Sequence, residues 1–148
     1  MSIREQIEKD FIEAFKAKEE KVKSVLGMIK AALKNKEIEI QKELSNDDVM
    51  DVLSKEAKKR KESAQAYKDG GRKDLADQEI SEYEVLKKYL PEELSEDAVR
   101  DIVKTTISET GATSPADMGK VIGAVMSKVK NQADGGLVSK LVKEELNK

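Results

Sequence analysis

Apolar residues recur at helical spacing in seven segments of the chain, and no segment shows the strict alternation of a half-buried strand. The widest apolar stripe lies between about Glu20 and Glu43, on one side of a helix with 3.6 residues per turn. Its members are Val22, Val25, Leu26, Ile29, Leu33 and Ile40. The pattern predicts an all-α protein without a sheet.

Start and stop signals group these segments into two domains. Ser45 is followed by acids, which is typical of a helix start, and Gly70-Gly71 ends the helix that follows. The stretch Leu90–Leu94 contains a proline, which disfavours helix at the residue before it. We therefore expect an N-terminal domain of about four helices over residues 1–93 and a small three-helix domain over residues 94–148.

Apolar spacing and cap residues also locate other helices of the two domains. The first helix starts near Ser2, and the apolar residues expected on the first and fourth helices are Ile7, Phe11, Phe15, Leu75, Ile80, Tyr83, Leu86 and Leu90. In the second domain Gly111 is placed to end a helix. Ser114-Pro115 is placed to open the next helix, with Asp117 completing a Ser-x-x-acid start.

Composition favours a location inside the cell. The 148 residues include no cysteine, so disulfides and thiolate metal sites are excluded. No apolar run approaches the roughly 18 residues of a membrane span, and the first residues lack the charged-then-apolar pattern of a signal peptide. We expect a cytoplasmic protein that makes no contact with a membrane.

The charge balance and the absence of histidine limit the reactions and ligands that the chain could support. With 28 basic and 30 acidic side chains the net charge is −2, so no global field attracts nucleic acid. Histidine, the usual general base near neutral pH, is absent, and many acids form helical pairs with bases, such as Asp51 with Lys55. We expect no catalytic residue, no metal site and no cofactor.

A row of lysines follows one side of the second predicted helix. Lys23, Lys30 and Lys34 fall within roughly one-sixth of a turn of each other. Lysines spaced in this way suit contacts with successive phosphates. The alternative is that the row is the solvated flank of a helix, and the spacing alone does not decide between the two.

Two glycines stand four residues apart in the sixth predicted helix. Glycine inside a helix costs about 0.5–1 kcal/mol relative to alanine, so Gly119 and Gly123 indicate a compensating contact. Either another part of the chain packs tightly against them, or the backbone of a partner approaches closely. We favour tight packing.

The C-terminal sequence resembles a known family. Ala116–Met126 (ADMGKVIGAVM), Val129-Lys130 and Ala133–Gly135 look like the YqeY proteins, which are stand-alone relatives of the tail of GatB, one of the subunits of the tRNA-dependent amidotransferase. Lys30–Ile38 and Tyr89–Ser95 are similar to the same family, so the resemblance covers nearly the whole chain.

The resemblance implies an all-α protein whose three-helix tail is the part shared with GatB. In the amidotransferase this tail helps to hold tRNA while other domains amidate the mischarged aminoacyl group. The family is filed among carbon–nitrogen ligases that use glutamine as amido donor, and for a tail-only protein this link rests on kinship. We expect no activity from the chain alone, and an activity within a complex stays open.

The resemblance also implies RNA-binding positions. These are Lys120, Lys128, Lys130 and Lys140 as phosphate contacts, with Gly119 and Gly123 allowing close approach. The chain departs from the family at Gly27, where an arginine is common, and at Asn131-Gln132, where Gly-Lys is common. Two positive charges are therefore missing, which would flatten the salt dependence of RNA binding. Asn131 tolerates a left-handed turn, so we expect the fold to survive.

Three functional hypotheses follow. The first is a non-catalytic accessory protein that binds tRNA and works beside amidotransferase or aminoacyl-tRNA synthetase proteins. The second is a helical protein–protein adaptor without an RNA role, which the near-neutral charge and the 3% aromatic content favour. The third is an amidotransferase-linked enzymatic role in a complex, supported by kinship alone. We expect no DNA binding.

Overall fold

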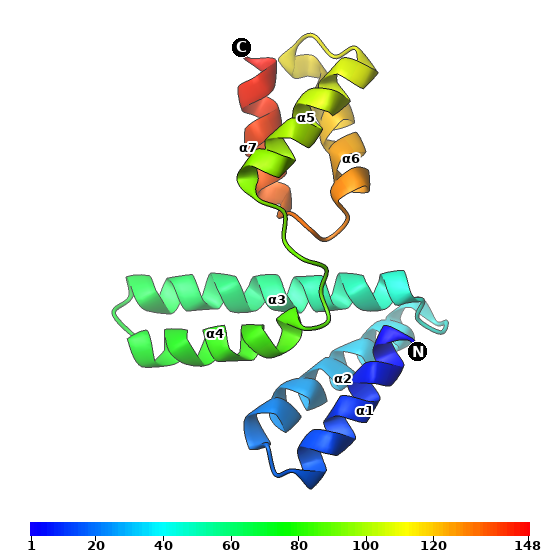
Figure 1. Ribbon diagram of the computed structural model, residues 1–148, viewed down its shortest axis with the longest axis vertical. Coiled ribbons are helices and arrows are strands. Elements are labelled where there is room, and N and C mark those ends of the chain that lie inside the picture. Colours follow the sequence, from blue (N-terminus) through cyan, green and yellow to red (C-terminus); the bar gives the residue numbers. More distant parts are fainter. The chain divides into compact units, whose positions relative to one another are not determined.

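The computed structural model describes residues 1–148 and contains seven α-helices, one 3₁₀ turn and no strand (Figure 1), which confirms the all-α prediction. The first four helices are α1 (Ile3–Lys16), α2 (Glu20–Ile40), α3 (Asn46–Asp69) and α4 (Lys73–Lys87). The last three are α5 (Glu96–Thr110), α6 (Met118–Val129) and α7 (Gly135–Leu146), with the 3₁₀ turn at Pro115–Asp117. None of the helices combines the length and the apolar character that crossing a membrane requires.

The chain divides into an N-terminal unit, Met1–Leu90, and a C-terminal unit, Pro91–Lys148. This division lies three residues before the boundary that the sequence predicts. The residues between belong to the C-terminal unit because they bond to it. The Leu94 backbone N–H donates to the Gln132 carbonyl oxygen at 2.8 Å, and the Gln132 side-chain amide donates to the Glu92 carbonyl oxygen at 3.2 Å.

Side-chain caps fix the starts of the helices that the serines predict. Ser2 and Ser45 each accept a hydrogen bond from the backbone N–H three residues on, and Glu5 and Asp48 complete reciprocal capping boxes. Ser95 accepts from the Ala98 N–H at 3.1 Å and caps α5 in the same way.

Two antiparallel helix pairs, α1 with α2 and α3 with α4, make up the N-terminal unit (Figure 1). The stripe predicted on α2 supplies much of the core, since Val25, Leu26, Ile29 and Leu33 are buried. They pack with Ile7, Val49, Leu53, Ala57, Val85 and Leu86. Periodicity placed two other residues wrongly, because Phe15 is 61% exposed and Ile80 is 48% exposed. Both lie on helices with an apolar face, but at positions that the neighbouring helices do not bury.

The C-terminal unit is a three-helix bundle with a valine- and leucine-rich core. Its buried members are Val99, Val103, Val121, Val125, Val129, Val138, Leu141, Val142 and Leu146. Gly111 ends α5 with φ +70, in the left-handed region that favours glycine. Ser114 is the N-cap of the 3₁₀ turn and Pro115 follows at its start, as predicted. The predicted capping box does not form, because the Ser114 side chain makes no cap bond and the Asp117 carboxylate accepts from the Thr113 N–H at 3.2 Å.

Candidate nucleic-acid interface

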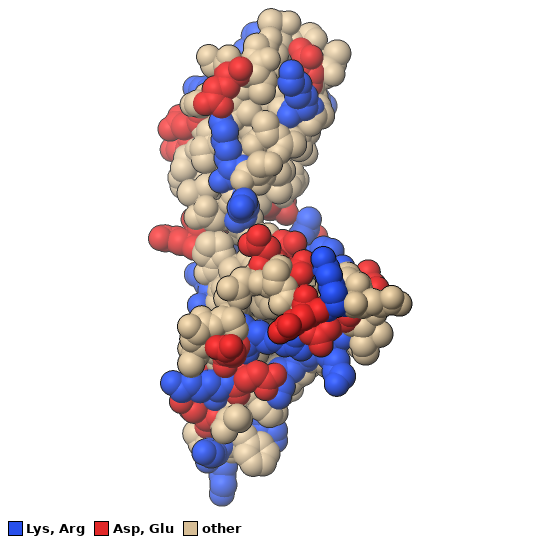
Figure 2. All heavy atoms as spheres, turned by 90° about the vertical axis from the view of Figure 1, so that its right-hand side faces the viewer, with Lys and Arg blue, Asp and Glu red and all other residues tan.

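Charge is unevenly distributed along the C-terminal unit. Residues 91–117, which contain α5, hold seven acidic and two basic side chains, a net charge of −5. Residues 118–143, which contain α6 and most of α7, hold five lysines and one acid, a net charge of +4. Figure 2 views the molecule from the side on which Figure 1 draws α6, and in the C-terminal unit it shows separate basic and acidic groups on a surface that is otherwise mostly uncharged.

Four of the five lysines in the basic half are exposed and form no ion pair. They are Lys120, Lys130, Lys140 and Lys143, which we call the C-terminal lysine set. Sequence reasoning named the first three and missed Lys143. The spacing from Lys140 could have identified Lys143, because residues three apart share one side of a helix. The core residues Leu141 and Val142 occupy the opposite side of α7.

Lys128, the fifth lysine, has a structural role. Its ammonium group forms an ion pair with Glu109 at 2.6 Å and donates a hydrogen bond to the Thr106 hydroxyl at 3.0 Å. Thr106 is fully buried, so the lysine joins α6 to the inner side of α5. The predicted phosphate contact at Lys128 would have to break both interactions.

The expectation of tight packing at the two glycines of α6 is wrong. A Cβ atom added at Gly119 or Gly123 would meet no other atom within 4 Å, and both residues are exposed. With Ser127 they form a side of α6 that lacks large side chains. This side lies between Lys120 and Lys130, which the helical rise separates by about 15 Å. The alternative, close approach by a partner, stays a prediction.

The turn between α6 and α7 is held in place. Lys130 and Asn131 both have positive φ, at 27 and 63, so Asn131 adopts the left-handed conformation that the sequence allows. The Asp134 carboxylate accepts from the Gly136 N–H at 3.0 Å and caps α7. A Cβ atom at Gly136 would lie 2.8 Å from Oδ2 of Asp134, so a larger residue there would have to displace the capping carboxylate.

A charged cluster fixes α7 against α5. The Arg100 guanidinium donates to Glu145 at 2.9 Å and to Glu144 at 3.0 Å, and Lys148 donates to Glu145 at 2.9 Å. The hydrogen bonds from Lys148 and Arg100 lower the pKa of Glu145 below its ordinary value. The cluster therefore positions the helix that carries Lys140 and Lys143.

The predicted lysine row of the N-terminal unit is mostly engaged within the unit. Lys23 lies 5.0 Å from the Phe15 ring centroid and pairs with Glu20 at 3.6 Å. Lys30 lies 4.2 Å from the centroid of the Phe11 ring and pairs with Glu8 at 3.0 Å. Lys34 alone is exposed without an ion-pair partner. The row does not present three free cations to a polyanion.

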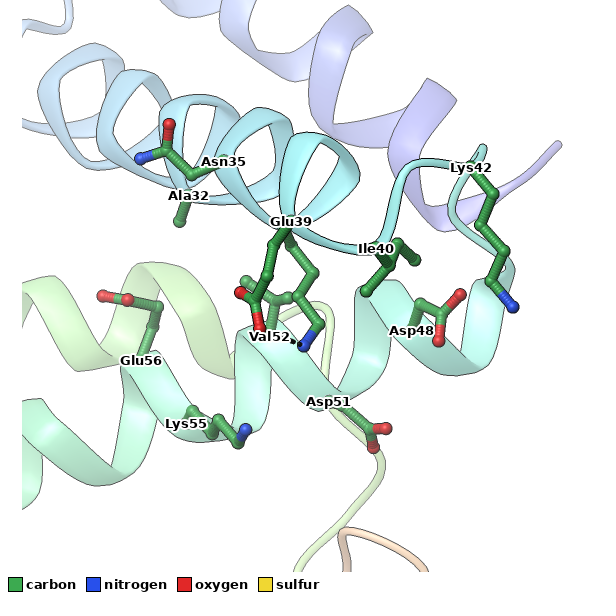
Figure 3. Close-up of a pocket in the computed structure, with 11 residues that line it drawn as sticks. Ala32, Asn35, Glu39, Ile40, Lys42, Asp48, Asp51, Val52, Lys55 and Glu56 are labelled. Carbon is green, nitrogen blue, oxygen red and sulfur yellow. Dashed lines mark ion pairs between the residues drawn. The ribbon is translucent and has the colours of Figure 1, made fainter.

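An open cleft of about 530 Å³ separates α2 from α3 (Figure 3). Its charged lining is mixed: Lys36, Glu39, Lys42, Asp48, Asp51, Lys55 and Glu56. Lys36 pairs with Glu39 at 3.6 Å, and the Ser45 backbone and hydroxyl lower the pKa of the capping residue Asp48. The acids with assigned contacts thus serve pairing and capping. No group of three or more acidic, histidine or cysteine side chains is placed to hold a metal ion.

Comparison with known proteins gives the relationship that the resemblance implied. The model of the "Yqey-like protein" family matches residues 4–146. The chain is 35% identical over 85 residues to "Altered inheritance of mitochondria protein 41, mitochondrial" of Lachancea thermotolerans, covering 57% of this chain but only 46% of that protein.

A second relative is an uncharacterised protein of Schizosaccharomyces pombe, 29% identical over 89 residues, which are 60% of this chain and 72% of that protein. The family match spans both units, from α1 to the last residue of α7. The chain therefore belongs to the YqeY-like protein family.

Proposed function

We propose that this chain is a non-catalytic accessory protein that binds tRNA through its C-terminal unit. The observation that carries the proposal is the C-terminal lysine set: four exposed, unpaired lysines in a stretch of net charge +4. The resemblance of this unit to the tail of GatB supports the same assignment. Any chemistry on the tRNA belongs to other proteins, for which amidotransferase and aminoacyl-tRNA synthetase proteins are candidates.

The lysines would act on the sugar-phosphate backbone. Each phosphate that a lysine neutralises releases condensed counterions, so four contacts predict that log K falls with log salt at a slope of about −3 to −4. Raising salt from 50 to 200 mM would then weaken binding about a hundredfold. The glycine side of α6 allows the backbone of the RNA to approach between Lys120 and Lys130.

The C-terminal unit suits a folded RNA better than a single strand. Residues 91–148 contain no phenylalanine, tyrosine or tryptophan, the side chains on which unpaired bases stack. Its contacts would therefore be to phosphates and would carry little base specificity. Transfer RNA is mostly double-helical and presents such a backbone.

The test is the affinity of the full chain for bulk tRNA across a salt series. A variant with Lys120, Lys130, Lys140 and Lys143 changed to alanine should lose most of the affinity and flatten the salt slope toward zero. The matched control changes four exposed lysines of the N-terminal unit, Lys68, Lys73, Lys87 and Lys88, to alanine. It carries the same net charge and should retain both affinity and slope.

Two outcomes would overturn the proposal. Absence of tRNA binding at low salt would favour the adaptor hypothesis instead. Equal losses in the two quadruple variants would mean that the protein attracts RNA by net charge and has no site in the C-terminal unit.

A further inference from the structure

Large hydrophobic side chains are exposed in the N-terminal unit and not in the C-terminal unit. The exposed ones are Met1, Ile12, Phe15, Met28, Ile38, Tyr67 and Ile80. Four of them belong to α1 and α2. Exposed apolar side chains that gather on one surface, unlike scattered ones, mark interaction sites.

Helical geometry brings several of these residues to one side of the α1–α2 pair. The seam between the two helices is marked by Lys23 over Phe15 and Lys30 over Phe11. At 100° per residue, Ile12 lies beyond this seam on the side of α1 away from the core, and Gly27, Ala31 and Ile38 lie beyond it on α2. We call Ile12, Phe15, Gly27, Ala31 and Ile38 the α1–α2 outer face.

The outer face has the dimensions of a helix-docking surface. A Cβ atom added at Gly27 would meet only Cε2 of Phe11, at 3.6 Å, and Ala31 is exposed, so the middle of the face is shallow and uncovered. Larger side chains stand toward its ends. From Lys23, opposite Phe15, to Ile38 the helical rise of α2 gives a length of about 22 Å, or four turns of a partner helix.

The charge left on this surface is positive. Its acids Glu8 and Glu20 already pair with Lys30 at 3.0 Å and Lys23 at 3.6 Å. Glu5, two turns before Ile12, accepts from the Ser2 N–H in the capping box of α1. Lys16, one turn beyond Ile12, and Lys34, one turn before Ile38, are exposed and form no ion pair. A complementary partner would therefore be acidic around an apolar stripe.

We infer that the α1–α2 outer face docks an acidic amphipathic helix of a partner protein. Apolar side chains of that helix at i, i+4 and i+11 would cover Ile12, Ala31 and Ile38, and its acids would meet Lys16 and Lys34. The one ring of the face, Phe15, has the Lys23 ammonium over it, and the other side chains are aliphatic or absent, so a protein fits the face better than RNA. The inference goes beyond tRNA binding because it assigns a separate surface in the other unit.

The test is an NMR titration of the ¹⁵N-labelled full chain. The probe is a synthetic peptide of four helical turns with leucine at i, i+3, i+4, i+7 and i+11 and glutamate elsewhere, and the control peptide has lysine in place of glutamate. We expect saturable shift changes confined to α1 and α2 with the acidic peptide, and at least tenfold weaker binding of the basic one.

Variants locate the contact. Ile12→Ser with Ile38→Ser should weaken binding of the acidic peptide at least tenfold, and Lys34→Glu should weaken it severalfold while Lys34→Arg retains it. Ile80→Ser is the matched control, since Ile80 is 48% exposed and Ile12 51%, and it should change nothing. Because these side chains are exposed, the melting temperature of each variant should stay close to that of the parent.

Three results would overturn the inference. One is absence of shift changes at millimolar acidic peptide, and another is equal binding of the acidic and basic peptides. The third is occupation of the face by something else: a dimer in sedimentation that Ile12→Ser with Ile38→Ser dissolves, or tRNA-induced shifts on α1 and α2. Failure here leaves the lysine test of the C-terminal unit unaffected, so the two proposals are separable.

Discussion

The two units differ in which lysines and which hydrophobic side chains they leave exposed. The N-terminal unit engages Lys23 and Lys30 in contacts with phenylalanine and glutamate, yet it leaves Ile12 and Ile38 exposed. The C-terminal unit exposes no large hydrophobic side chain, and the four lysines of the C-terminal lysine set have no ion-pair partner. A lysine therefore indicates polyanion binding only where the fold provides it with no internal partner.

The difference also separates the kinds of recognition that each unit supports. Exposed aliphatic side chains gain free energy when a partner covers them, whereas exposed lysines gain it by neutralising phosphates. We therefore propose a protein partner for the N-terminal unit and RNA for the C-terminal unit. The predictions below test whether the units are distinct in stability, in acid response and in the use of their lysines.

The largest expected effect comes from opening either core. Leu26 in the N-terminal unit and Leu141 in the C-terminal unit are both 0% exposed. Leu26→Ala and Leu141→Ala should each cost about 2–5 kcal/mol, because the deletion loses buried contacts and leaves a cavity. Urea unfolding can assign each loss, since all three tyrosines lie in the N-terminal unit while far-ultraviolet circular dichroism reports every helix.

If the cores are independent, Leu26→Ala shifts the tyrosine fluorescence midpoint and Leu141→Ala leaves it unchanged. In the dichroism signal, Leu141→Ala should produce an early phase that fluorescence does not show. A fluorescence midpoint that moves with Leu141→Ala would contradict the division into two cooperative units.

The second prediction concerns acid stability of the C-terminal unit. The pKa of Glu145 is lowered in the folded state by hydrogen bonds from Lys148 and Arg100. A lowered folded pKa gives stability that is present above the ordinary value of about 4.3 and is lost as pH falls through the folded pKa. Urea midpoints by circular dichroism should fall below about pH 4.3, and Glu145→Gln should flatten that fall.

The tyrosine signal provides the control for Glu145→Gln. Glu37 and Asp48 also have lowered pKa values, through hydrogen bonds from Arg4 and from Ser45, so the N-terminal unit has an acid response of its own. That response should be the same with and without Glu145→Gln. A change in it would show that the charged cluster acts beyond its own unit.

The third prediction separates two neighbouring lysines of the basic half. Lys128→Met should destabilise the C-terminal unit by about 1 kcal/mol, because it removes the Glu109 ion pair and the hydrogen bond to Thr106. Lys130→Met should leave stability nearly unchanged and reduce the salt slope of tRNA binding by about one. A slope that falls as much with Lys128→Met would mean that RNA displaces Glu109.

The helices were predictable because their signals are local. Apolar spacing within each segment predicts the helices, and Ser2, Ser45 and Ser95 mark where three of them begin. The start of α6 was the exception. There the Asp117 carboxylate bonds to the Thr113 N–H instead of completing a box with Ser114, a choice between two nearby donors that spacing does not make.

The candidate sites were only partly predictable because they depend on contacts between helices. Periodicity gives the angle of Phe15 around α1, but it does not say whether another helix buries a side chain at that angle. In the structure the Phe15 side chain is 61% exposed. Lys30 finds Glu8 at 3.0 Å and Lys128 finds Glu109 at 2.6 Å across helix pairs. Partners 22 and 19 residues away in sequence cannot be assigned from spacing along a single helix.

The smallest expected effect tests the open glycine side of α6. Gly123→Ala should stabilise the C-terminal unit by about 0.5–1 kcal/mol, because alanine favours helix and the added Cβ meets nothing within 4 Å. Gly136→Ala is the contrasting variant, which should gain less, because its Cβ would lie 2.8 Å from the capping oxygen of Asp134 and would displace it from the cap. If Gly123→Ala gains stability but weakens tRNA binding, the glycine serves close approach of the RNA backbone. If affinity is unchanged, the phosphates are held by lysine side chains at a distance from the α6 backbone, and this glycine has no part in the interface.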